Sequence, residues 1–69
     1  MDRVLELDGR ASAGIEVSLL WRPTTNKLAV LVRDEVEGEM FAVPVEPVEA
    51  LDVFRHPYAY RHRGDAVPF

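Results

Sequence analysis

The residues best suited to chemistry lie together near the end of the chain, in the stretch FRHPYAYRHR. This stretch, residues 54–63, holds both histidines, both tyrosines and three arginines. Tyrosine rings can stack on bases and arginines can neutralise phosphates, so the stretch could bind a nucleic acid or a small ligand. The candidate contact residues are Arg55, His56, Tyr58, Tyr60, Arg61 and Arg63.

The charge of the rest of the chain argues against a polyanionic partner. The formal net charge is −4, and residues 34–52 include seven acidic residues and no Lys or Arg. This acidic segment weakens the long-range attraction of a nucleic acid to the arginines that follow it. We therefore expect a nucleic-acid partner to be the less favoured alternative, and the tyrosines to pack against the fold.

Metal binding and catalysis have weaker signals. His56 lies four residues after Asp52, so the two would share one face of a helix, but two ligands do not make a zinc site. The sequence has no cysteine and no phosphate-binding glycine pattern, and no motif around Ser12 or Ser18 marks a nucleophile. We expect a non-enzymatic protein without a metal or cofactor.

Alternating apolar residues predict the sheet that must position this stretch. The strands are predicted near residues 14–22, 27–34 and 39–44, joined by turns in RPTTN and DEVEGE. Pro44 cannot donate a ladder hydrogen bond, which indicates that the third strand lies at a sheet edge. The segment RVLELDG could add a short fourth strand, with DGRASAG as a flexible connection.

A change in apolar spacing predicts one helix near residues 47–56. Val48, Leu51 and Phe54 recur at helical spacing, and Ala50 and Val53 widen this apolar face. The helix should end before Pro57, because the residue preceding a proline avoids helical geometry.

The elements predict a single α+β domain: an antiparallel meander of three or four strands with one C-terminal helix packed on one face. Residues 1–13 are expected to be flexible or to form a short extra strand. Beyond the helix, Tyr58 and Tyr60 are expected in an extended segment, with both rings covering apolar surface on one side. Residues 61–69 are expected to form a mobile basic tail.

The central predicted strand, KLAVLVR, is apolar on both sides, but one helix can cover only one face of a sheet. Leu20, Leu31 and Met40 are among the residues left on the uncovered face. We therefore predict that the domain binds protein through this face, either as a symmetric homodimer or with another chain.

Two longer runs also resemble a known group of proteins. EVSLLWRPTTNKLAVLV and PVEPVEALDVFRHPYAY are similar to segments of small actinobacterial proteins that end near an HPYAY sequence. Those proteins have no established activity. The resemblance therefore implies a shared fold and no particular chemistry.

The sequence has no sign of export or of membrane insertion. MDRVLELDGR alternates charged and apolar residues, whereas a signal peptide has a basic start and a continuous apolar stretch. No apolar run is long enough for a membrane span. We expect a cytoplasmic protein without a membrane partner.

Overall fold

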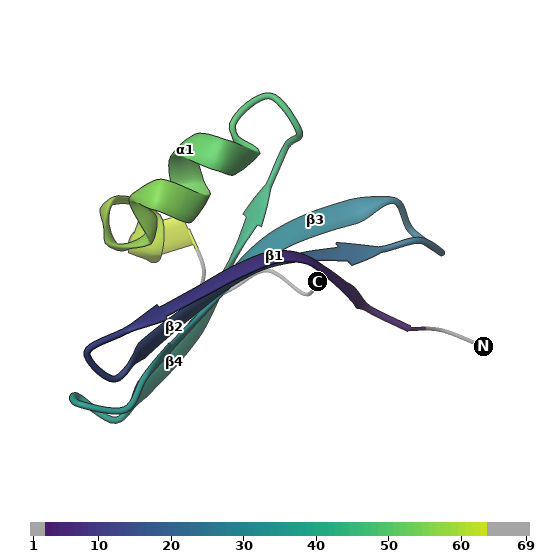
Figure 1. The fold of residues 1–69 in the computed structure, drawn as a ribbon. Helices are drawn as coiled ribbons and strands as arrows, with labels where there is room; N and C mark the ends of the chain where they lie inside the picture. The colour runs from purple at the N-terminus through teal and green to yellow at the C-terminus, as the bar shows by residue number, and fades with distance from the viewer. Residues whose placement is uncertain (1–2, 64–69) are drawn as a thin grey trace.

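The computed structural model describes residues 3–63, which form a four-stranded antiparallel sheet followed by two short helices (Figure 1). The strands are β1 (Leu5–Ser12), β2 (Ile15–Arg22), β3 (Lys27–Asp34) and β4 (Glu39–Val45), and they lie in the sheet in chain order. The helices are α1 (Ala50–Arg55) and the 3-10 helix η1 (Pro57–Arg63). This confirms the predicted α+β fold. Within residues 3–63, neither helix has the length and apolar character needed to cross a membrane.

Residues with positive φ make the tight turns between the strands. Asn26 has φ 55°, and its side-chain oxygen accepts a hydrogen bond from the Trp21 indole at 3.1 Å. The β1–β2 turn contains Gly14 at φ 82°, where an added Cβ would lie 2.9 Å from a methyl carbon of Val36. Gly14 is therefore required by both backbone conformation and space. Its carbonyl also accepts the Glu35 N–H at 2.9 Å, which joins this turn to the β3–β4 turn.

The first strand is longer than predicted. The expected flexible connection DGRASAG instead continues β1 through Ser12, which pairs with Ile15, and a β-bulge interrupts the register between Glu6 and Asp8. Most of β1 is exposed, because α1 packs on the other three strands and η1 packs on β4. A strand without a covered face needs no alternation of apolar residues, which explains why the sequence pattern did not reveal its full length.

The helix begins later than predicted and buries only part of its predicted apolar face. It starts at Ala50, and its buried residues are Ala50, Val53 and Phe54. Val48 is 96% exposed and Leu51 is 58% exposed, so the predicted apolar face was wrong for these two residues and correct for the other three. The buried positions follow the i, i+3, i+4 spacing counted from the true start of the helix.

The hydrophobic core lies between α1 and one face of the sheet, which we call the inner face. Figure 1 shows both helices together on this side. The core residues are Val17, Leu19, Val30, Val32, Phe41, Val43, Val45, Ala50, Val53 and Phe54. The helix α1 contributes three buried side chains to this core, those of Ala50, Val53 and Phe54. Because a small domain buries little apolar surface, each of them contributes a large share of its stability.

We expect Phe54→Ala to lower the free energy of unfolding by about 3–5 kcal/mol, because it leaves a cavity under the covering layer. Leu51→Ala is the matched control on the same helix, and its cost should stay within about 0.5 kcal/mol because the side chain is largely exposed. Urea unfolding followed by circular dichroism would measure both. Equal losses for the two variants would contradict the observed helix face.

Candidate functional site

The predicted interface residues lie on the outer face of the sheet, opposite the helices. Register places Leu20 on β2, Leu31 on β3 and Met40 on β4 with their side chains on this face. Leu20 and Leu31 are half-buried, and Met40 is 65% exposed. No helix of residues 3–63 lies over them. The structure therefore brings the three predicted residues to one uncovered surface.

Large and small side chains alternate at the centre of the outer face. Leu20 pairs with Ala29 across the strands, and Ser18 pairs with Leu31. Each leucine thus has a small neighbour across the ladder and a small neighbour two residues along its own strand. Ala29 is fully buried although no helix of residues 3–63 covers this face, and its neighbours across the ladder are the larger Leu20 and Pro44. We call these four central positions, Ser18, Leu20, Ala29 and Leu31, the checkerboard.

Charged side chains border the checkerboard at both ends of β2 and β3. At one end Glu16 pairs with Arg33, and their side chains form an exposed ion pair with 3.8 Å between Oε1 and Nη1. An exposed pair of this length contributes little to stability. At the other end Arg22 pairs with Lys27. The outer face therefore has an apolar centre and polar ends, as a protein interface does.

The C-terminal segment is tied to the sheet through Asp34, the last residue of β3. The Asp34 side chain is buried, with 5% exposed, and its Oδ2 accepts the Tyr58 hydroxyl at 2.8 Å. Its Oδ1 accepts the backbone N–H groups of Val36 and Glu37, each at 3.0 Å. The Glu37 N–H and the Tyr58 hydroxyl lower the pKa of Asp34, and the same carboxylate raises the pKa of Tyr58.

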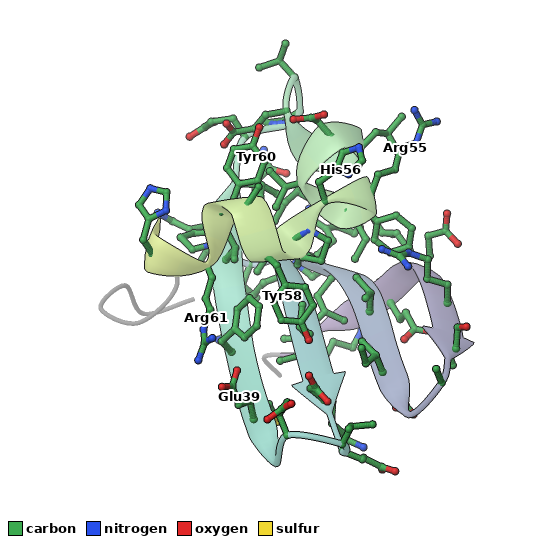
Figure 2. All side chains as sticks on the ribbon, turned by 90° about the vertical axis from the view of Figure 1, so that its left-hand side faces the viewer. Glu39, Arg55, His56, Tyr58, Tyr60 and Arg61 are labelled. Carbon is green, nitrogen blue, oxygen red and sulfur yellow. The ribbon has the colours of Figure 1, made fainter. Side chains whose placement is uncertain are left out.

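A second set of contacts surrounds the Phe41 ring. The Tyr58 ring meets it edge to face at 5.5 Å between centroids, and the Arg61 guanidinium lies 5.4 Å from its centroid. Arg61 also forms an ion pair with Glu39 at 2.8 Å. Figure 2 shows Tyr58 and Arg61 extending from η1 towards the strand end that carries Glu39. Tyr58 and Arg61, two of the six candidate contact residues, therefore both make contacts within the fold.

The other candidate residues lie elsewhere. Tyr60 extends away from Tyr58 (Figure 2), and its hydroxyl bonds to the Asp52 carboxylate. Arg55 and His56 are exposed at the end of α1. Of the five predicted contact residues whose side chains the structure describes, Arg55, His56 and Tyr58 line one groove, whereas Tyr60 extends away from Tyr58 and Arg61 is paired with Glu39. Among the residues that the structure describes, no group of three or more His, Asp or Glu side chains could hold a metal ion.

We expected an extended segment after the helix, and the structure shows that this prediction was wrong. Pro57–Arg63 forms the 3-10 helix η1, so Tyr58 and Tyr60 point in different directions instead of sharing one side. Of the predicted mobile tail 61–69, the first three residues belong to this helix, and Arg61 has the contacts given above. Residues 64–69 lie outside the described part of the chain, as does the side chain of Arg63.

Sequence reasoning missed Asp34, Glu39 and Phe41 as partners of the C-terminal segment. A signal existed for Asp34, since an aspartate at the start of a turn often accepts the N–H groups that follow it. Glu39 and Arg61 are 22 positions apart, and no local pattern relates them. Such pairs become visible only when the topology is known.

No protein-family model, curated protein or solved structure matches the chain. The resemblance to proteins ending near HPYAY therefore stays a prediction. What the domain does has to be inferred from its surfaces.

Acid should remove the contribution of Asp34 to stability. The pKa of Asp34 is lowered in the folded state from an ordinary value of 3.8. A lowered pKa contributes stability that is fully present above the unfolded-state value and is lost as the pH falls through the folded-state value. We expect Asp34→Asn to melt at a lower temperature than the wild type at pH 7, and the difference to shrink below about pH 4.

Glu35→Gln is the control, because it removes the neighbouring exposed carboxylate while Asp34 stays in place. Its melting temperature should follow that of the wild type between neutral and acid pH. A gap between Asp34→Asn and the wild type that stays constant down to about pH 2 would contradict the role of the charged carboxylate.

Proposed function

We propose that this is a non-enzymatic, cytoplasmic protein-binding domain whose partner is a second copy of itself. The two copies join through the outer faces of their sheets. The observation that carries the proposal is the checkerboard, because this arrangement of large and small side chains is complementary to its own rotated image.

The complementarity follows from simple geometry. Consider a two-fold axis that lies between the two sheets and runs along the strands, midway between β2 and β3. Such an axis would set Leu20 opposite the partner's Ala29 and Leu31 opposite the partner's Ser18. Each leucine would then occupy the space over a small residue, so that the sheets could pack closely.

The same axis also matches charges at one end of the face. Glu16 would lie opposite the partner's Arg33, and Arg33 opposite the partner's Glu16, which extends the existing ion pair into a group of four alternating charges. At the other end Arg22 would face the partner's Lys27. These long side chains can keep their charged groups in water at the rim, so the cost of this second contact is small.

The size of the face sets the expected affinity. Four strands about 4.8 Å apart, about eight residues long at about 3.4 Å per residue, cover about 500 Å². Two copies would bury about 1,000 Å² in total, which is the lower limit for a specific interface. We therefore expect a weak dimer in equilibrium with monomer, with a dissociation constant in the micromolar range or above.

The intramolecular contacts of the C-terminal segment favour this function over nucleic-acid binding. Tyr58 and Arg61 are the side chains that a stacking and phosphate-binding surface would need. Both have partners in Asp34, Glu39 and Phe41, and releasing them would cost those contacts. The checkerboard, by contrast, is not covered by either helix of residues 3–63.

Sedimentation equilibrium over a wide range of concentration tests self-association. We expect the wild type to change from monomer to dimer as its concentration rises to about 1 mM. Leu31→Glu should remain folded and monomeric, because it adds a charge at the centre of the proposed interface. Leu51→Glu is the matched control, since Leu51 is exposed on the opposite side of the molecule. A wild type that stays monomeric throughout, or a Leu31→Glu variant that dimerises normally, would refute the proposal.

Charge reversal tests the direction of the two-fold axis. Glu16→Arg and Arg33→Glu should each weaken the dimer, because each creates like charges across the interface. The double variant should restore dimerisation, since the axis along the strands brings these two positions together. An axis across the strands would instead set Arg33 opposite the partner's Lys27, and Arg33→Glu alone would then strengthen the dimer.

A further inference from the structure

A groove lies on the inner face of the sheet, where the helical layer ends. It runs between the β1–β2 hairpin and the junction of α1 and η1, and its volume is about 580 Å³. Ile15 and Val17 form its apolar floor on β2, while Arg10 and Ser12 form the wall on β1. This volume is typical of sites for small molecules, which combine apolar walls with a few polar groups. The groove lies on the face opposite the checkerboard, so the inference does not depend on dimerisation.

The charged side chains that line the groove are basic. The chain has 12 acidic and 8 basic residues, but the residues that line the groove include Arg10, Arg55 and His56 and neither Asp nor Glu. Figure 2 shows Arg55 and His56 at the end of α1, with their side chains extending into solvent at the rim. Arg10 is therefore the principal cation at the groove wall and can attract an anion. The nearest buried carboxylate, Asp34, pairs in register with Ile15, and it already accepts the Tyr58 hydroxyl and two backbone N–H groups.

Several contacts hold Arg10 in place. Its Nη2 donates to the carbonyl oxygens of Phe54 and Arg55, at 3.0 Å and 3.3 Å, and its guanidinium lies 5.5 Å from the centroid of the Phe54 ring. A guanidinium has five N–H donors on three nitrogens, and these two bonds use one nitrogen. The side chain is thus already ordered, so binding a carboxylate would cost little additional side-chain entropy.

We propose that this groove binds a small organic carboxylate that carries an apolar group. The carboxylate accepts hydrogen bonds from the Arg10 guanidinium and from the Ser12 hydroxyl. The apolar group rests on Ile15 and Val17, beneath Pro57. A carboxylate suits this site because its two oxygens match the planar guanidinium. The ligand should also carry an apolar group because the floor of the groove is apolar.

Nuclear magnetic resonance of the 15N-labelled full chain tests the site, with benzoate as the probe. We expect saturable shifts of the backbone amides of Arg10, Ser12, His56 and Ala59, all of which line the groove. Benzyl alcohol has a similar shape without the charge, and inorganic phosphate has the charge without the apolar group. Both should bind at least about tenfold more weakly than benzoate, a difference of about 1.4 kcal/mol.

Arg10→Gln removes the charge and keeps a side-chain donor for the Phe54 carbonyl, and it should weaken benzoate binding at least about tenfold. Arg55→Gln, at the rim, should have a smaller effect. The proposal is overturned if benzoate leaves the groove amides unshifted, if benzyl alcohol or phosphate binds as tightly as benzoate, or if a folded Arg10→Gln binds as the wild type does. The comparison of the three probes on the wild type decides the matter even if Arg10→Gln does not fold.

Discussion

The arrangement of the C-terminal half depends on one buried carboxylate. Asp34 accepts two backbone N–H groups from the β3–β4 turn and one hydroxyl from η1, so it fixes the turn and docks the helix with the same side chain. Docking brings Tyr58 and Arg61 against Phe41 and thereby closes this end of the core. A buried charge is costly when its hydrogen bonds are missing, so the turn, the strand end and η1 stabilise one another.

The two faces of the sheet differ because the helices of residues 3–63 pack on only one of them. This helical layer packs on the inner face over β2, β3 and β4 and leaves the inner side of β1 open, which creates the groove beside Arg10. On the outer face, Ala29 and Ser18 keep the surface shallow, while Leu20 and Leu31 supply apolar area. Both proposed binding surfaces thus arise from the same shortage of covering structure.

Much of the fold could be predicted from local patterns, and the errors have physical causes. The alternation in β2, β3 and β4 located three strands correctly, and Pro44 does lie on an edge strand. Val48 and Leu51 were wrongly included in the helix face because turns, and not helix, occupy residues 47–49, so the helical spacing begins at Ala50. The outer-face residues could be predicted because they follow from strand register. The contacts of Arg61 and the groove could not, because they join segments that are distant along the chain.

The hydrogen bond between the Gly14 carbonyl and the Glu35 N–H favours the correct alignment of β2 and β3 over misaligned pairings. A slip of one residue between β2 and β3 would move every side chain of one strand to the opposite face. It would also separate Gly14 from Glu35 and remove Val36 from the space that Gly14 leaves for it. Only the correct alignment brings the two turns together. The contact between the turns therefore favours the correct pairing of β2 and β3, whose backbone hydrogen bonds could also form in the slipped alignment.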